Sequence, residues 1–447
     1  MTLLEAGFRT SAIQALYKTI GEEDLEKTSI VVKTSQQYYQ KISLLYLAIV
    51  CLIAVFYPFV IKTEIPYVEV FLVIILQGMV GVINFAFRSS YQQLLSAEGK
   101  YYIISLIGLI TTTLTYIAKI ITIRVFNNVI IMQLMGVVVI IIQVIIYALY
   151  FNKEYAWIDK DAEVDDSLLQ NRKYYITQQI AGLIFNSTDT LVLSVFCGLK
   201  VASVYAVYNL VYSALAQIMN LIRSSTGFVL GQSYHKGELL FKRIYSAYSS
   251  MQTTVGGIMA SISIILIIGF IRIYTEGITD VNYLDFMAAF LFSFNLILEC
   301  SRGASLAAAN IAGKAPETTS HYIMEAAINL STSLLLVKLL GMRGVLLGTS
   351  IAGLYRTTDS IIYTNRRVLM QSPFFEAKMV ITSFLLYFIF AFLGYSVISV
   401  HCADYIELLF DAIRVGIVVV IVYGTVYFII NYSWIKSFLN NFSIRTK

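Results

Sequence analysis

The sequence predicts an all-α protein that crosses a membrane many times. Hydrophobic residues make up 58% of the 447 residues and charged residues only 13%, whereas a soluble domain carries about a quarter charged residues. The mean hydropathy is +0.74, and 4 prolines leave long helices uninterrupted. Transmembrane strands would be about ten residues of strict alternation, which the apolar runs lack. Early runs reach the roughly 20 residues that span the bilayer as helix: 42–61, 68–87, 102–123 and 130–151.

Taken in order, the chain predicts about thirteen helices. A moderately apolar helix over 3–20 and a polar connector precede the four early runs. The polar stretch 152–173 predicts a linker. After it we expect spans at 174–196, 201–230, 240–273, 283–311, 322–339, 341–363, 375–400 and 408–430. This order predicts an N-terminal lobe of about five helices (1–151), the linker (152–173), a C-terminal lobe of six helices (174–366), and two extra helices with a tail (367–447).

Basic residues predict the orientation of these spans. Lys and Arg concentrate in alternate loops, among them the linker and the C-terminal tail, whereas the opposite loops are poorer in them. Because positively charged loops stay in the cytoplasm, we expect the linker and the C-terminus there. The net charge of +5 follows from this bias and from arginines inside the spans, and calls for no nucleic-acid partner.

Two arginines reveal a duplication. Arg88 and Arg302 are each followed, after ten residues, by Gly-Lys, and they lie 302 − 88 = 214 positions apart. The same offset relates Arg9 to Arg223. Matching anchors in one order predict a repeated unit of roughly two hundred residues. Because both copies share one orientation, they are expected to be related by an axis along the membrane normal.

A third pair of anchors suggests a slightly different offset. Lys119 and Arg124 are five residues apart, as are Lys338 and Arg343, at an offset of 219, which predicts a small insertion. Lys119 and Lys338 are both expected to extend outward to the membrane surface. The first copy begins opposite the second span of the later copy, so we expect an N-terminal piece of some forty residues or more to be missing from the sequence.

Charged residues inside the spans are the candidate functional residues. A charge at the bilayer centre costs roughly 2.5–3.5 kcal/mol on insertion scales, so each should face a wet cavity or a partner. The guanidinium fork matches phosphate and carboxylate groups. We therefore expect that arginines inside the spans bind an anionic head group of the substrate: Arg9, Arg88, Arg223, Arg302 and Arg356. We expect that the carboxylates inside the spans serve ion coupling or charge pairing: Asp189, Glu299 and Asp359.

Spacing suggests which of these charges neutralise each other. Glu299 and Arg302 are three residues apart on one helix, as are Arg356 and Asp359, and such residues are neighbours. Each pair is expected to be an ion pair. Arg88 has no carboxylate three or four residues away, and neither has Arg223. These two are the preferred contacts for anionic cargo.

Other kinds of chemistry leave no signal in the sequence. Cys51, Cys197, Cys300 and Cys402 are scattered without a Cys-x-x-Cys motif, so neither a metal site nor a disulfide framework is expected. No phosphate-binding glycine loop, dinucleotide fingerprint or catalytic triad appears. We expect no cofactor, no bound metal and no enzymatic activity, and any transport would draw on an ion gradient or on consumption of the cargo.

Several stretches resemble the multidrug/oligosaccharidyl-lipid/polysaccharide (MOP) exporter superfamily, and within it the Wzx-type flippases of O-antigen and capsule assembly. They are Leu4-Glu5-Ala6-Gly7-Phe8-Arg9, Asn186-Ser187-Thr188-Asp189-Thr190-Leu191, Arg302 through Gly313-Lys314, and Gly341-Met342-Arg343-Gly344-Val345. The resemblance implies a MATE-like bundle of two lobes around a vestibule, with the first of fourteen helices missing. It also implies alternating access in the bacterial inner membrane. The implied cargo is an undecaprenyl-pyrophosphate-linked oligosaccharide, and the implied partners are this cargo, membrane lipid and other polysaccharide-assembly membrane proteins.

Two other functions remain open. A cation-coupled exporter of small molecules, of MATE type, would place more carboxylates than arginines in its cavity. An integral-membrane polymerase or ligase acting on polyprenyl substrates would need long outward loops for its catalytic residues. The arginine surplus and the short loops of this sequence favour the flippase.

Overall fold

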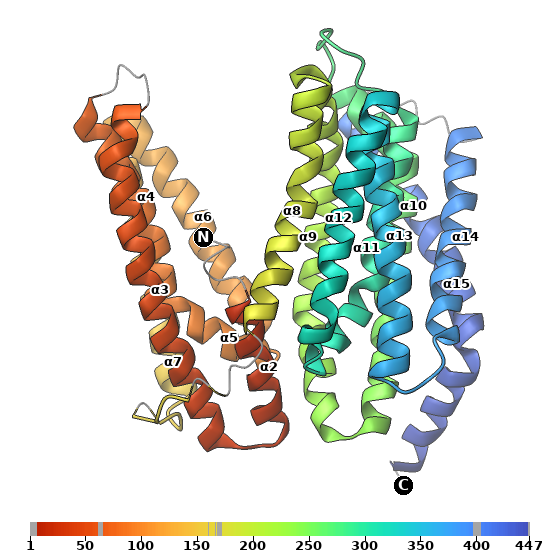
Figure 1. Ribbon diagram of the computed structural model, residues 1–447, viewed down its shortest axis with the longest axis horizontal. Coiled ribbons are helices and arrows are strands. Elements are labelled where there is room, and N and C mark those ends of the chain that lie inside the picture. Colours follow the sequence, from red (N-terminus) through yellow and green to blue (C-terminus); the bar gives the residue numbers. More distant parts are fainter. Residues whose placement is uncertain are drawn as a thin grey trace. The chain divides into compact units, whose positions relative to one another are not determined.

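The computed structural model describes residues 7–60, 66–159, 161–165, 167, 172–396 and 404–445. They form thirteen helical segments and no strand, which confirms the predicted fold class, and eleven segments are long and apolar enough to cross a membrane. The segments are α2 (Phe8–Gly21), α3 (Leu25–Val60), α4 (Tyr67–Ile83) running through the π-helix η1 (Asn84–Arg88) into α5 (Ser89–Ala97), α6 (Tyr101–Phe126), α7 (Val129–Glu154), α8 (Arg172–Phe196), α9 (Leu199–Lys236), α10 (Glu238–Tyr274), α11 (Phe286–Ile311), α12 (Ala315–Leu340), α13 (Met342–Arg367), α14 (Phe374–Ser396) and α15 (Tyr405–Arg445) (Figure 1).

The contacts divide the chain into two compact units. Unit 1 comprises residues 1–180, 223–241 and 313–319. Unit 2 comprises residues 181–222, 242–312 and 320–447. The division passes through helices, because the end of α9 and the starts of α8, α10 and α12 belong to unit 1. The lobe boundaries expected from the sequence stay a prediction.

Helix ends support the duplication and correct one of its anchors. The bounds of α6 and α12 differ by 315 − 101 and 340 − 126, both 214, and those of α7 and α13 differ by 213. The repeat therefore needs no insertion before α12. Lys119 of α6 corresponds to Ser333 of α12 rather than to Lys338, so the anchor pair at offset 219 is wrong. The expected turn is present in both copies, since Gly99 has φ +81° and Gly313 has φ +71°, which glycine adopts without strain.

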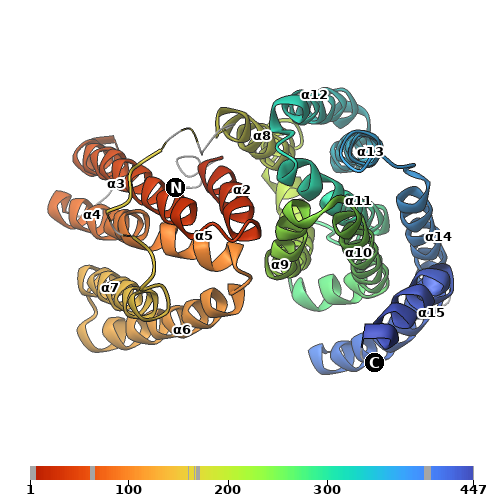
Figure 2. The ribbon, with the colours of Figure 1, turned by 90° about the horizontal axis from the view of Figure 1, so that it is seen from below.

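Close helix packing builds unit 1. A Cβ at Gly81 of α4 would lie 2.4 Å from the ring of Tyr46 on α3, so glycine is what lets these helices approach. The ring of Phe8 on α2 stacks on Tyr38 of α3 with centroids 3.6 Å apart. Viewed from below, α3 lies beside α4 and α6 beside α7, and α5 lies between these two pairs (Figure 2). The predicted linker lies against α3, where the amide of Asp159 donates to Ser29 Oγ at 3.2 Å.

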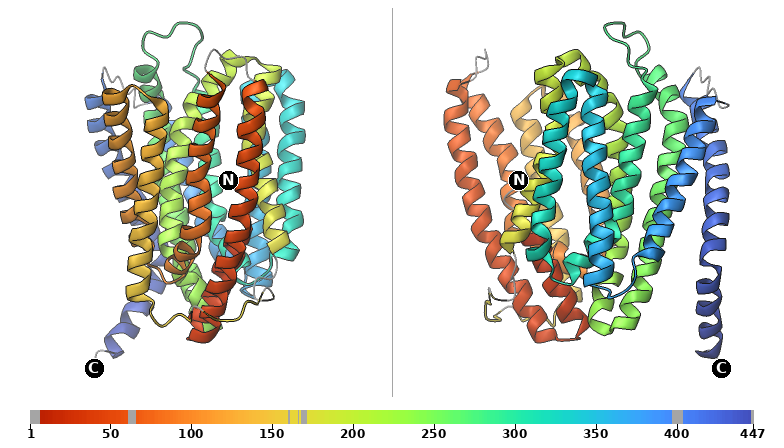
Figure 3. Two further views of the ribbon diagram at one scale, coloured as in Figure 1. Left: turned by 90° about the vertical axis from the view of Figure 1, so that its left-hand side faces the viewer. Right: turned by 45° about the vertical axis from the view of Figure 1, so that its right-hand side comes forward.

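In unit 2, α14 and α15 lie side by side at the edge of the other helices (Figures 2 and 3). The hydroxyl of Tyr427 on α15 donates to the carbonyl of Met379 on α14 at 2.8 Å. A Cβ at Gly257 of α10 would lie 2.2 Å from Ser383 Oγ of α14 and 2.6 Å from the ring of Tyr423 on α15. These contacts attach the two extra helices to α10.

Candidate functional site

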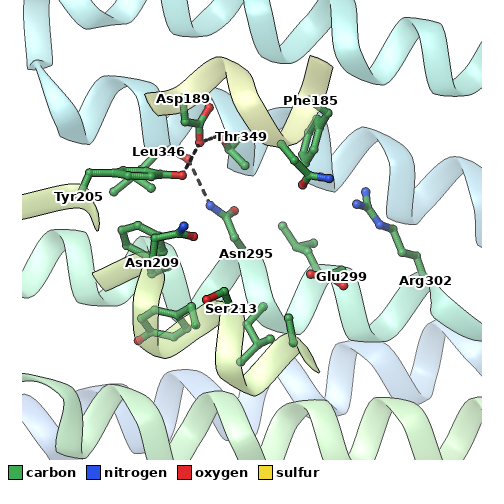
Figure 4. Close-up of a pocket in the computed structure, with 17 residues that line it drawn as sticks. Phe185, Asp189, Tyr205, Asn209, Ser213, Asn295, Glu299, Arg302, Leu346 and Thr349 are labelled. Atoms are coloured by element: carbon green, nitrogen blue, oxygen red, sulfur yellow. Dashed lines mark hydrogen bonds between the residues drawn. The ribbon is translucent and has the colours of Figure 1, made fainter. Parts of the chain in front are cut away.

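A cavity in unit 2 combines apolar walls with a cluster of polar side chains. It has a volume of about 220 Å³ and is lined by α8, α9, α11 and α13. Asp189 of α8, Tyr205 and Asn209 of α9, Asn295 of α11 and Thr349 of α13 point into it (Figure 4). The sequence predicted Asp189 as a functional carboxylate but did not indicate which residues surround it.

Asp189 is buried among hydroxyl and amide groups. Its Oδ2 accepts from Thr349 Oγ1 at 2.9 Å and from Tyr205 Oη at 3.3 Å. Its other oxygen, Oδ1, is buried and has no hydrogen-bond partner among the described residues, and the same holds for Oδ1 of Asn329. Asn329 Nδ2 donates to Thr349 Oγ1 at 2.9 Å. A buried carboxylate with a spare acceptor calls for a proton or a small cation.

A network of charges runs along α11, α12 and α13. Arg302 binds Glu325 Oε1 at 2.5 Å, and Glu325 Oε2 lies 3.6 Å from Arg356 Nε. Arg356 in turn donates to Asp359 Oδ2 at 2.9 Å, and the same oxygen lies 2.6 Å from His321 Nδ1. The ion pair predicted between Arg356 and Asp359 is therefore confirmed.

The partner predicted for Arg302 is wrong. Arg302 pairs with Glu325 across to α12, whereas the spacing rule had selected Glu299, which instead lines the cavity beside it. An (i, i+3) spacing makes a contact available but does not choose it, because a residue on a neighbouring helix can offer better geometry. Glu325 was missed although it is a carboxylate inside a predicted span.

Unit 1 contains a second polar pocket, of about 240 Å³, between η1, α6 and α7. Arg88 Nη1 donates to Gln143 Oε1 at 2.7 Å, and Gln143 Nε2 donates to Thr111 Oγ1 at 2.7 Å. Lys119 lines the same pocket with its amino group 3.5 Å from Gln133 Oε1. Lys119 is thus directed into the lobe rather than outward, which corrects the sequence-based expectation; Lys338 is exposed, as predicted.

Two predicted arginines lie apart from both pockets. Arg9 is half-buried in the first turn of α2, and Glu5, its nearest carboxylate in sequence, lies outside the described residues. Arg223 is half-buried and is the first residue of the part of α9 that belongs to unit 1. Neither is among the described residues that line the two pockets. Their expected role in substrate binding stays a prediction.

The described residues contain no cluster of three or more His, Cys, Asp or Glu that could hold a metal ion. Cys402 and His401 fall outside that part of the chain. Unit 2 does offer oxygen donors of mixed type around Asp189, and carboxylate, hydroxyl and amide oxygens are ligands that hard cations accept.

Comparison with known proteins identifies the fold. No sequence family and no curated protein matches the sequence. An outward-facing multidrug resistance MATE family transporter of the MOP superfamily has a TM-score of 0.69 at 15% identity, over 85% of this chain and 86% of that one. A MATE transporter in complex with MaL6 has a TM-score of 0.71 at 14% identity, over 82% and 84%.

A third structure comes from Pyrococcus furiosus and has a TM-score of 0.64 at 15% identity, over 83% of this chain and 86% of that one. It is described as a MOP superfamily transporter in which the reverse polarity of the binding pocket suggests a different function. The chain therefore has the fold of MOP-superfamily transporters and is a multi-pass membrane protein. At these identities the likeness concerns the fold alone.

Proposed function

We propose that the protein is a flippase that moves undecaprenyl-pyrophosphate-linked oligosaccharide across the bacterial inner membrane by alternating access, for O-antigen, capsule or exopolysaccharide synthesis. The observation that carries the proposal is the charge of the unit 1 pocket. It is lined by Arg88 and Lys119, and none of the described residues lining it is Asp or Glu. Guanidinium and ammonium groups in a wet pocket attract phosphate.

Unit 2 narrows which arginines can serve this role. Arg302 and Arg356 are held by Glu325 and Asp359, so their charge is largely used inside the protein. We assign the contact with the anionic head group first to Arg88, with Arg223 and Arg9 as further candidates. The neighbour with a reversed pocket polarity shows that pocket polarity differs between proteins of this fold, which supports using charge to choose between cargoes.

Export of small molecules coupled to a cation is the second candidate. It is favoured by Asp189, whose buried carboxylate has a spare oxygen beside Asn329. We propose Asp189 as the site where a proton or small cation is bound during transport. This role is compatible with either cargo, because coupling and cargo binding use different units. We do not propose a polymerase or ligase, since the structural neighbours are transporters.

The orientation belongs to the same proposal. The excess of basic residues in alternate loops supports a cytoplasmic linker and C-terminus. In that orientation the cargo is loaded from the cytoplasmic leaflet and released to the other side. Its partners would be the lipid-linked oligosaccharide, membrane lipid and other polysaccharide-assembly membrane proteins.

Complementation tests the proposal. A bacterium that lacks its own oligosaccharide flippase and carries matching sugar-assembly genes would receive the chain, Arg88→Ala, Arg223→Ala, or the control Lys338→Ala at an exposed lysine. We expect the chain and the control to restore surface polysaccharide, and Arg88→Ala to lose it at equal protein level. Drug resistance conferred without restored polysaccharide would favour the small-molecule exporter. Full activity of Arg88→Ala would contradict the assigned role of this arginine.

A further inference from the structure

The outer face of α13 contains a hollow that is separate from the cavity around Asp189. The hollow has a volume of about 940 Å³, and the described residues that line it come from α13 and the turn that follows it. It shares none of these residues with the cavity. The buried side of α13 packs on α11, and α13 lies at the outer edge of unit 2 (Figure 2). In a membrane protein such an outer face meets lipid.

The hollow changes from apolar to basic along the helix. Leu354 and Ile362 expose 45% and 40% of their surface, whereas Arg366 and Arg367 are exposed in the last turn of α13. From Leu354 to Arg366 the chain advances 366 − 354 = 12 residues, or about 18 Å of helix. Half of the hydrocarbon core is about 15 Å thick. The hollow therefore has the length and the polarity gradient of one lipid leaflet, from acyl chain to head group.

The two arginines at the basic end carry charge that the described part of the chain does not neutralise. Neither Arg366 nor Arg367 makes an ion pair with a described residue. Asp359, a carboxylate that lines the same hollow, is already engaged. Its Oδ2 accepts from Arg356 at 2.9 Å and lies 2.6 Å from His321 Nδ1. The basic end thus has a positive surplus, which a phosphate group complements in charge and in geometry.

The residues beside the arginines are typical of a membrane surface. Tyr363 lines the hollow one turn before Arg367 and is half-buried. Met370 and Phe374, which follow the helix, expose 70% and 73% of their surface. Tyrosine is enriched where the hydrocarbon meets the head groups, and exposed apolar side chains next to basic ones favour the same boundary. This composition places the guanidinium groups at the level of the lipid phosphates.

We propose that the hollow is a binding site for an anionic phospholipid of the surrounding membrane. Its phosphate contacts Arg366 and Arg367, and one acyl chain follows α13 past Ile362 to Leu354. Basic pockets at transmembrane helices bind anionic head groups in this way. The occupant is a resident lipid rather than the transported cargo, because the hollow lies on the outside of α13. The inference goes beyond the proposed function and does not depend on it.

Titration of phosphatidylglycerol onto the purified full chain in detergent, read by native mass spectrometry, tests the site. The test variant combines Arg366→Gln with Arg367→Gln. The matched control combines Arg243→Gln with Arg272→Gln, which removes two exposed arginines elsewhere in unit 2. We expect the chain and the control to bind one phosphatidylglycerol saturably and more tightly than phosphatidylcholine. The test variant should lose affinity roughly tenfold or more, as for loss of hydrogen bonds to a charged group.

A second variant tests the acyl-chain part of the hollow without changing any charge. Thr358, which lines the hollow between its two ends, is exposed, and Thr358→Trp fills this space. Leu385→Trp on α14, at a side chain that is 59% exposed, is the control. We expect Thr358→Trp to weaken binding of phosphatidylglycerol by roughly tenfold, because the bulky ring occupies the path of the chain. This variant decides alone if the double arginine variant does not fold.

Equal affinity of the chain and both test variants, or equal affinity for phosphatidylglycerol and phosphatidylcholine, would overturn the site. Displacement of the lipid by polyprenyl pyrophosphate at equal or lower concentration would assign the hollow to the cargo instead and refute the proposal. Equally tight binding of glycerol 3-phosphate would refute it in favour of a soluble phosphate. Lipid binding without complementation supports this site and counts against the flippase, and the opposite result does the reverse.

Discussion

Arg88 and Arg302 stand at equivalent positions of a repeat, yet their surroundings differ in charge. Arg302 meets a carboxylate on the neighbouring helix at 2.5 Å, and a second arginine lies against that carboxylate. Arg88 meets an amide at 2.7 Å, in a pocket that it shares with Lys119. The comparison shows that both copies of the repeat place an arginine at the same position. The groups that contact this arginine differ between the two units. In unit 2 the arginine pairs with a carboxylate of a neighbouring helix, and in unit 1 it donates to an amide in a pocket that also holds a lysine.

The backbone differs at the same place. Helix α11 is α-helical through Arg302, whereas Arg88 ends the π-helix η1. A π-helix adds a residue to one turn and appears frequently at functional sites. It re-aims the residues on one side of the helix. We relate the direction of the Arg88 side chain to this turn.

The largest expected effect is in unit 2. Glu325→Gln leaves the buried Arg356 and the partly buried Arg302 without their shared carboxylate, and breaking a buried pair costs about 3–5 kcal/mol. The unfolding midpoint in detergent should fall clearly, while Glu276→Gln in an exposed loop should leave it unchanged. An unaltered midpoint for Glu325→Gln would mean that the network of unit 2 is not structural, and the comparison would fail.

A second prediction concerns transport. Asp189→Asn keeps the shape of the side chain and removes its charge. In proteoliposomes we expect the variant to lose the dependence of transport on an imposed proton or sodium gradient, with a fall of roughly tenfold or more in rate if proton transfer is involved. Glu276→Gln serves as the control. A gradient response equal to that of the unaltered chain would exclude Asp189 as the coupling group.

Gln143→Leu tests the relay that orients Arg88. It removes the acceptor of Arg88 and the donor to Thr111, which should destabilise the chain by about 1–3 kcal/mol. Pyrophosphate affinity should also fall, because the guanidinium loses its orientation. Gln133→Leu, which removes only a long contact with Lys119, is the comparison and should change stability less. The reverse order of effects would show that Lys119, not Arg88, is the anchored cation.

The smallest effect is expected for Lys119→Met without any added anion. Removing one of two like charges from a pocket should leave the unfolding midpoint unchanged or slightly higher, by up to about 1 kcal/mol. Adding pyrophosphate should then raise the midpoint of the unaltered chain but not that of the variant. A marked loss of stability in Lys119→Met would instead assign this lysine a structural role.

Much of the fold followed from composition and from the length of the apolar runs, because a helix must satisfy its backbone hydrogen bonds within the bilayer. The duplication was visible in Arg88, Arg302 and the Gly-Lys turns. Its register was not, since one coincidence of lysines suggested an offset of 219 that the helix ends of α6 and α12 correct. A few charged anchors locate a repeat, but apolar residues between them carry little register information.

The sites were less predictable. The spacing rule gave the partner of Arg356 correctly, because both residues are on one helix, and it failed for Arg302, whose partner comes from α12. Contacts between helices depend on packing that a single sequence does not display. Lys119 was placed outward because lysines near a span end usually extend to the surface. Gly136 of α7 leaves room for the inward side chain of Lys119. This glycine can be recognised as a signal only once it is known that α6 packs against α7.

The most direct test of the central claim exchanges the charge arrangement of the two units. Transport of a labelled polyprenyl-pyrophosphate-linked saccharide into proteoliposomes would be compared for the chain, Thr111→Glu and Thr111→Gln at equal reconstitution. If unit 1 uses the positive charge of its pocket, contributed by Arg88 and Lys119, for the cargo, Thr111→Glu loses transport while Thr111→Gln retains most of it. Equal transport by Thr111→Glu and Thr111→Gln would contradict the account, because an internal carboxylate would then have neutralised the pocket without consequence.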